Sequence, residues 1–413
     1  MVSQPKRAAS DVERVLRAHW GPSVAWLAGQ LGDVELAEAC VREALALALE
    51  RCEQNGMPAR PLEWMQAAAR RRAVLRLRQR AQGCAYPEQP EDSLTGAATS
   101  GPQEQGLRDD LLALLFLCTH PALSPAAAIA RILHTVRGLD EEALASALQL
   151  EPGVVQQRLV EARLAVSQLD VAFRPPDVRA IAQWLDRHLG LLHAIFAEGD
   201  CASHGDWAAS DALCDEALEL VSLLVRLLPA EPDVLGLASL MRFTIARRAA
   251  RYSAQGLMIP VEAQNRAMWD GGQVTEAASL LERALRQRRP GRYQLLAAIA
   301  ATHAQARTGA KTNWGRIVHL YDLLLFWDPA PKIELERAVA VGKHQGPQWG
   351  LAIVDNIRRS NDLEHSYQLH AARGELLDKW GKHAAARDAY LQASDLCANL
   401  TERRSFLGHT AST

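Results

Sequence analysis

Hydrophobic residues recur at intervals of three and four along most of the chain. In the segment DVELAEACVREALALALERC they fall at Val34, Ala37, Val41, Leu45 and Ala48. This spacing places them on one face of a helix. Alternating β-branched runs bounded by turn residues, which are typical of strands, do not occur in the sequence. The chain is therefore predicted to be all-α.

Two segments interrupt the helical pattern. Residues 85–106, AYPEQPEDSLTGAATSGPQEQG, hold three prolines, three glycines, four acidic residues and no basic residue. Such a composition buries no core, so a flexible acidic linker is predicted there. The second break is FRPPD at 173–177, where two prolines forbid a continuous helix. The predicted divisions are 1–84, the linker 85–106, 107–172, 173–290 and 291–413.

The last predicted division has the character of helical repeats. NWGRIVHLYDLLLFWDP (313–329) has the Trp, Ile, Tyr and trailing Pro spacing of a tetratricopeptide helix. LHAARGELLDKWGKHAAARDAYLQASDL (369–396) has the small residues and glycines of a tightly packed helix pair. A C-terminal helical array with tetratricopeptide-like repeats is expected, and such arrays bind peptides or small ligands on a concave surface.

The strongest charge feature is ARRRAVLRLRQRAQ at 69–82. Six arginines fall within eleven residues, with no acidic residue among them. An arginine-rich helix suits a phosphate backbone, and this interpretation is favoured over a merely solvated surface helix. The candidate DNA-binding residues are Arg70, Arg71, Arg72, Arg76, Arg78 and Arg80.

A second candidate nucleic-acid element lies at 140–169. LDEEALASALQL followed by EPGVVQQRLVEARLAV has the pattern of a helix-turn-helix. Gln156 and Gln157, near the start of its second helix, have the chemistry to bond adenine edges. The only basic residues are Arg158 and Arg163, set against five acidic residues, which leaves a charge of −3. The buried stripe of this helix is predicted to be Val155, Leu159, Ala162 and Val166.

Composition narrows the class of protein. The chain has 413 residues, 48% of them hydrophobic, and a net charge of −2, so any DNA contact must be a local patch. Seven cysteines occur without a CxxC pair, which predicts reduced thiols and a cytoplasmic protein. No signal peptide or membrane span is expected. No metal or cofactor is expected either, because no phosphate loop, nucleophile elbow or HExxH motif occurs.

Polar and aromatic residues gather in three stretches of the second half, at 198–206, 264–270 and 291–304. The first stretch holds Glu198, Asp200, Cys201, His204 and Asp206 around a glycine, and a hydrophilic loop between helices is favoured there over a metal or catalytic site. The other two stretches suit a polar-aromatic pocket for a small molecule, while buried structural hydrogen bonding explains the same mixture equally well. The candidate pocket residues are Glu198, Gln264, Arg266, Trp269, Asp270, Tyr293, Gln294, His303 and Trp314.

The order of these segments resembles the extracytoplasmic-function sigma factors that carry a C-terminal tetratricopeptide-type extension. LGDVELAEACVREALALALE is similar to the helix by which that family grips RNA polymerase. PLEWMQAAARRRAVLRLRQ is similar to the helices that melt the promoter, and DDLLALLFLCTHPALSP to the start of the upstream-element domain. AQNRAMWD, GRYQLLAAIAATHA and HAARGELLDKWG resemble stretches of the extension. The resemblance covers almost the whole chain.

The resemblance implies a sigma region 2 domain, a helix-turn-helix region 4 domain and a regulatory extension. It implies binding to core RNA polymerase and promoter DNA, without catalysis by the chain itself. Asp33, Glu38, Arg42 and Glu43 would face the polymerase. The arginines at 70–80 would meet the promoter near the start site, and Gln156, Gln157, Arg158 and Arg163 would address the upstream element.

Two other functions stay open. The charge of −3 at 140–169 favours a descendant that kept the sigma scaffold but lost promoter reading. Such a protein would serve as a small-molecule enzyme or ligand-binding protein through a pocket in the extension. The repeats alone would also suit a protein scaffold.

Overall fold

The computed structural model describes residues 15–82, 104–169, 173–176, 178–201, 207–253, 257–360, 363 and 365–412. Within these residues the secondary structure is helical, and the β-type pairing found there is one isolated bridge between Tyr252 and Met258. The prediction of an all-α fold is confirmed. By its internal contacts the chain divides into two compact units, Met1–Leu192 and His193–Thr413.

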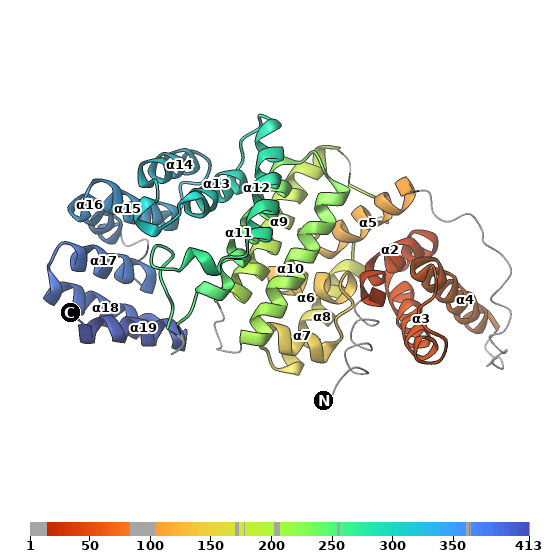
Figure 1. Cartoon of the computed structure of the whole chain (residues 1–413). Helices are drawn as coiled ribbons and strands as arrows, with labels where there is room; N and C mark the ends of the chain where they lie inside the picture. Colours follow the sequence, from red (N-terminus) through yellow and green to blue (C-terminus); the bar gives the residue numbers. More distant parts are fainter. Residues whose placement is uncertain are drawn as a thin grey trace. The chain divides into compact units, whose positions relative to one another are not determined.

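The first unit contains seven complete helices and the beginning of an eighth, among the residues that are described (Figure 1). They are α2 (Trp20–Leu31), α3 (Val34–Asn55), α4 (Pro61–Gln82), α5 (Glu104–Cys118), α6 (Pro125–Thr135), α7 (Glu141–Leu148), α8 (Pro152–Ser167) and α9 (Val178–Cys201). Of the predicted linker 85–106, residues 85–103 lie outside the described part of the chain. The last three residues of that segment form the start of α5. Residues 173–176 are not helical, as the two prolines predict.

Local sequence signals set where these helices begin. The Asp33 carboxylate accepts a bond of 2.9 Å from the amide of Leu36 and so caps α3. Ser124 and Asp140 cap α6 and α7 in the same way. Of the stripe predicted on α3, only Leu45 is not fully buried. The three- and four-residue spacing therefore identified the buried face correctly.

The N-terminal end of α2 packs against the end of α6. The Trp20 indole N–H donates to the carbonyl of Thr135 at 2.9 Å, and the ring is 2% exposed. Gly138 follows with φ of +70°, and a Cβ there would stand 2.8 Å from the Trp20 ring. Because both the dihedral and the space demand glycine, this turn fixes α2 against α6.

Thr119, after α5, is a hydrogen-bonding centre for the first part of α9. Its hydroxyl accepts from the Trp184 indole N–H at 2.8 Å, lies 3.1 Å from Nδ1 of His188 and donates to the carbonyl of Leu115 at 2.8 Å. Burial lowers the pKa of His188 to about 3, so the ring is neutral. Arg187 bonds the Thr119 carbonyl at 3.1 Å. These contacts dock α9 onto the turn between α5 and α6.

In the second unit each helix from α12 onward packs on the next, and Figure 1 shows them following one another in chain order. The helices are α10 (Trp207–Leu227), α11 (Pro232–Ala246), η2 (Arg248–Ala250), η3 (Arg266–Met268), α12 (Gly271–Arg286), α13 (Arg292–Gln305), η4 (Gly309–Lys311), α14 (Trp314–Trp327), α15 (Pro331–Gln345), α16 (Pro347–Arg359), α17 (Tyr367–Lys379), α18 (His383–Leu396) and α19 (Leu400–Ser412).

The two segments singled out as repeats form α14 and the pair α17–α18. Between α17 and α18, Gly381 adopts φ of +77°, which ends the first helix. Gly374 lies under the Tyr390 ring, where a Cβ would approach to 2.9 Å. The small residues thus let these two helices approach closely, as the sequence predicts.

Candidate functional site

Helix α4 carries the arginine cluster and packs on its unit through its first half. Pro61 occupies its first turn, where the missing amide costs nothing, and alanine, leucine and arginine favour the helix that follows. Met65, Ala68, Ala69 and Ala73 are buried and attach the helix to its unit. The arginines project from the remaining surface of the helix.

The six arginines divide into two groups. Arg72 and Arg76 are half-buried and both pair with the Glu43 carboxylate of α3, the former at 3.6 Å. We call them the paired arginines. The other four are exposed, and we call them the exposed quartet: Arg70, Arg71, Arg78 and Arg80. Because Glu43 already balances part of the charge of the paired arginines, the exposed quartet holds most of the charge that α4 offers to phosphate.

The pair α7–α8 presents a helix, a three-residue turn and a second helix. Gln149 in the turn has φ of +50°, and its amide donates to carbonyls of α7. Val155, Leu159 and Ala162 are buried as predicted, whereas Val166 is only half-buried.

The surface of the same helix pair carries the predicted base-reading residues. Gln156, Gln157 and Arg163 are exposed, and Arg158 is half-buried. All five acidic residues of 140–169 are also exposed. This surface therefore offers amide groups to a base edge but little positive charge to phosphate.

The residues predicted to face polymerase are placed differently from one another. Asp33 is the cap of α3, and Glu43 holds the paired arginines. Glu38 is 7% exposed and accepts a hydrogen bond from the Thr135 hydroxyl of α6. Arg42 is exposed, with a guanidinium nitrogen 3.3 Å from Nε2 of His134. In this arrangement Glu38 points into the unit, toward Thr135 at the end of α6.

The candidate pocket residues separate into structural positions and one cluster. Tyr293 and Gln294 are buried where α13 packs on α11, and a Cβ on Gly236 of α11 would stand 2.7 Å from the amide of Gln294. Asp270 caps α12, accepting from Gly272 at 2.8 Å. Glu198 is exposed on α9. These four residues are explained by packing, capping and solvation.

The remaining candidates lie near one another. The Arg266 guanidinium stacks on the Trp269 ring at 4.1 Å, and the rings of His303 and Trp314 meet edge to face at 5.3 Å. Positive charge on Arg266 contributes to lowering the pKa of His303, after burial and Arg247. Gln264 is buried in the segment just before Arg266, with its amide nitrogen bonded to the carbonyl of Ile259 at 2.9 Å.

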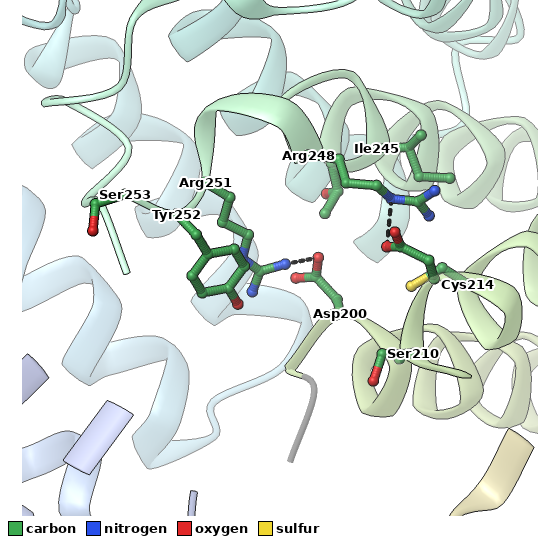
Figure 2. Close-up of a pocket in the computed structure, with 11 residues that line it drawn as sticks. Asp200, Ser210, Cys214, Ile245, Arg248, Arg251, Tyr252 and Ser253 are labelled. Carbon is green, nitrogen blue, oxygen red and sulfur yellow. Dashed lines mark hydrogen bonds and ion pairs between the residues drawn. The ribbon is translucent and has the colours of Figure 1, made fainter. Parts of the chain in front are cut away.

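A separate pocket of about 330 Å³ lies among α9, α10 and the end of α11 (Figure 2). Figure 2 shows Arg251 directed at Asp200, with which it forms an ion pair. Arg248 bonds Asp211 at 2.8 Å and Asp215 at 3.2 Å. The wall is thus lined by cations that are already paired with carboxylates.

Burial shifts the pKa values of several groups that line this pocket. Burial raises the pKa of Cys214 to about 12, with the Asp200 charge adding to the effect, so the thiol stays protonated. Burial raises the pKa of Tyr252 to about 12, with Arg251 opposing the rise. For Arg251, burial acts to lower the pKa, but the Asp200 carboxylate holds it above the ordinary value. The pocket is suited to binding a polar molecule.

The sequence analysis placed Glu198, Asp200 and Cys201 in a loop, whereas α9 continues through Cys201. Position 199 of this helix requires glycine, because a Cβ there would stand 2.7 Å from the carbonyl oxygen of Ser210 on α10. His204 and Asp206 of the same stretch lie outside the described residues. Arg248 and Arg251 were not among the predicted pocket residues. The signal in the sequence was a pair of arginines three positions apart, just beyond a helix.

Three observations concern metal sites, thiols and apolar helices in the described part of the chain. No group of three or more histidine, cysteine or acidic side chains there is arranged to hold a metal ion. The six cysteines that are described all carry free thiols. None of the helices there has the length and apolar character needed to cross a membrane.

Comparison with known proteins gives two similarities. Residues 185–285 match the family of unknown function DUF6596, and this range includes the pocket of Figure 2 as well as Arg266 and Trp269. The chain is also 35% identical, over 376 residues, to a Rhizobium meliloti (strain 1021) protein described as uncharacterized. The match covers 90% of this chain and 88% of that relative. The chain therefore belongs to the same family as the Rhizobium meliloti protein.

Proposed function

We propose that the chain is an RNA polymerase sigma factor of the extracytoplasmic-function type, with its second unit as a regulatory extension. The observation that carries this proposal is the exposed quartet on α4. Four exposed arginines on one helix, attached to its unit through buried alanines, form an electrostatic footprint for a phosphate backbone.

The pair α7–α8 supports the same function as a helix-turn-helix. Its second helix presents Gln156 and Gln157 at the N-terminal end, where a recognition helix contacts base edges. The exposed acids beside them oppose phosphate binding. We therefore assign most of the DNA affinity to α4 and to the bound polymerase, and base reading to α8.

Polymerase binding is assigned to the face of α3 that carries Asp33, Glu38, Arg42 and Glu43. Glu38 becomes available to a partner only when α3 parts from α6, because the carboxylate is buried against Thr135. Thr135→Val removes the hydroxyl donor and leaves Glu38 buried without it, which favours separation of the two helices. We expect this variant to bind core polymerase at least as tightly as the wild type, whereas Glu38→Gln binds more weakly.

Size-exclusion chromatography with purified core RNA polymerase tests the proposal. The full chain is expected to co-elute with the core enzyme at moderate salt. Glu38→Gln should reduce the co-eluting fraction, and Glu219→Gln, a change on α10, should not. A chain that elutes alone at every salt concentration contradicts the proposed function.

One observation favours a second function, in which the scaffold binds a small molecule and no longer reads promoters. The pocket of Figure 2 is lined by two arginines, and α7–α8 carries more acid than base. This alternative predicts weak DNA binding that fades with salt and no transcripts from any promoter. A promoter-specific transcript would exclude it.

A further inference from the structure

Hydrogen-bond donors without acceptors are concentrated around Arg266 in the second unit. All three guanidinium nitrogens of Arg266 are buried, and none has a hydrogen-bond partner among the described residues. Nε1 of Trp269 is likewise a buried donor without an acceptor, and Nδ1 of His303 is buried without a partner. The buried Oε1 of Gln264 also lacks a partner among the described residues. A buried guanidinium without an acceptor is costly, so a fold that retains one calls for a physical explanation.

The nearest acidic residue does not supply the missing acceptor. Burial lowers the pKa of Arg266, and the charge of Glu262 opposes this change only in part. The Glu262 carboxylate therefore acts on Arg266 through its charge and makes no hydrogen bond to the buried guanidinium. That carboxylate is bonded by Lys343 and lies 3.7 Å from Lys379. The same two lysines also pair with Glu375. Two carboxylates are thus matched with two lysines, and no carboxylate of the described residues pairs with Arg266.

A second cation adds to this positive region. Arg247, just after α11, is half-buried. Burial lowers its pKa, the Asp200 carboxylate opposes this change, and the charges of Arg251 and Arg266 add to the lowering. Burial lowers the pKa of His303 to about 4, with Arg247 and Arg266 as further causes, so the imidazole is neutral. Burial is the main cause of both shifts, and the charge of Arg266 contributes to each.

The side chains of the cluster are held in place from several directions. Trp269 covers one face of the Arg266 guanidinium at 4.1 Å. The Trp314 ring contacts His303 at 5.3 Å and lies 5.7 Å from the Lys343 ammonium. A Cβ on Gly309 would collide with the carbonyl of Glu262, so the η4 turn presses directly on that residue. A site held this way is preorganised, which lowers the entropy lost on binding.

From these observations we propose that Arg266, Trp269 and His303 form a binding site for an oxyanion, a carboxylate or phosphate group of a small molecule. An oxyanion accepts hydrogen bonds and donates none when fully ionised, which complements a cluster of unpaired donors. The planar guanidinium matches such a group with two parallel bonds. The indole N–H and the imidazole add further donors, and the bound charge offsets that of Arg266.

The site lies directly beneath the surface. Asn265, Ala267 and Met268, the neighbours of Arg266 in the η3 turn, are all exposed, Met268 to 49%. Arg266 therefore belongs to a short turn whose other residues already face solvent. The site is distinct from the pocket of Figure 2, whose arginines are already paired. It does not depend on whether the chain binds polymerase.

The test is thermal unfolding of the full chain at constant ionic strength, with sodium chloride replaced stepwise by inorganic phosphate, acetate or succinate. We expect at least one of these anions to raise the Tm by about 2–4 °C at saturating concentration. If only phosphate raises the Tm, the ligand carries a phosphate group. If only acetate or succinate raises it, the ligand carries a carboxylate.

Three variants assign the effect to the cluster. Arg266→Met should abolish the rise and leave the Tm in chloride equal to or above that of the wild type, because it removes an unpaired buried charge. Arg266→Lys, which keeps the charge but lacks the planar fork, should reduce the rise. Arg283→Met, a change of an exposed arginine on α12, should leave it intact. The proposal is overturned if none of the three anions raises the Tm of the wild type, or if Arg266→Met and Arg266→Lys both keep the full rise.

Discussion

Helix α4 gives the sharpest quantitative prediction, because the structure separates the exposed quartet from the paired arginines. Each phosphate neutralised on B-DNA contributes about 0.9 to the slope of log affinity against log salt. Full engagement of the exposed quartet therefore sets a slope of up to about 3.6 for α4, equivalent to about two orders of magnitude in affinity between 50 and 200 mM salt. The paired arginines, held by Glu43, add much less.

The perturbation is replacement of all four members of the exposed quartet by glutamine, which keeps helix propensity while removing charge. A parallel variant replaces Arg72 and Arg76 by glutamine. Fluorescence anisotropy with a labelled duplex that contains an unpaired bubble, titrated from 50 to 200 mM sodium chloride, measures the slope. The fourfold variant should lose most of the slope, and the twofold variant should lose little. Unfolding curves of both variants check that each remains folded.

Releasing the paired arginines gives the opposite change. Glu43→Gln removes their shared carboxylate, so the slope should rise by up to about 1.8 if both then reach phosphate. If the twofold variant loses as much slope as the fourfold variant, the exposed quartet does not carry most of the DNA-binding charge, and the prediction is refuted. A wild-type slope near zero would also refute the prediction.

Three further predictions concern the first unit. Gly138→Ala should destabilise the chain by about 1–3 kcal/mol in urea unfolding, because the residue combines φ of +70° with contact to Trp20. Gly32→Ala, at φ of +67° with open space around it, should cost less, and an equal loss would contradict the packing argument. Burial raises the pKa of Asp110 to about 6, with Asp109 adding to the effect, so the folded state holds a proton between pH 3.8 and 6 that the unfolded state has lost. The free energy of unfolding therefore falls as the pH rises through that window. Asp110→Asn should raise the Tm at pH 8 but not at pH 3.5. A difference in Tm between variant and wild type that does not change with pH would contradict this. Thr119→Val should cost about 1–3 kcal/mol, measured by the same urea unfolding, because it leaves a buried indole N–H without its acceptor.

Local patterns in the sequence predict the helices and their buried faces well. The stripe on α3 and most of the stripe on α8 follow from spacing alone, since each residue's burial depends on its own turn of helix. The caps at Asp33, Ser124 and Asp140 are equally local, because each side chain bonds an amide three residues away. Helices α14, α17 and α18 also lie where the repeat pattern predicts them.

Contacts between distant residues are what the sequence did not reveal. Glu43 and Arg76 are 33 positions apart, and Glu38 and Thr135 are 97 positions apart, so no local pattern links them. The end of α9 was predicted to be a hydrophilic, glycine-containing loop. In the structure it is helical, and a Cβ at position 199 would collide with Ser210 and Cys214 of α10. Among the nine candidate pocket residues, only the folded chain separates the cluster around Arg266 from Tyr293 and Gln294, which serve packing.

In vitro transcription tests the central claim most directly. Core RNA polymerase, the full chain and a library of supercoiled plasmids carrying genomic DNA of the source organism are combined, and the 5′ ends of the transcripts are mapped. We predict discrete start sites that require the chain and weaken when the exposed quartet is replaced by glutamine. Transcripts that are the same with and without the chain would contradict the assignment as a sigma factor.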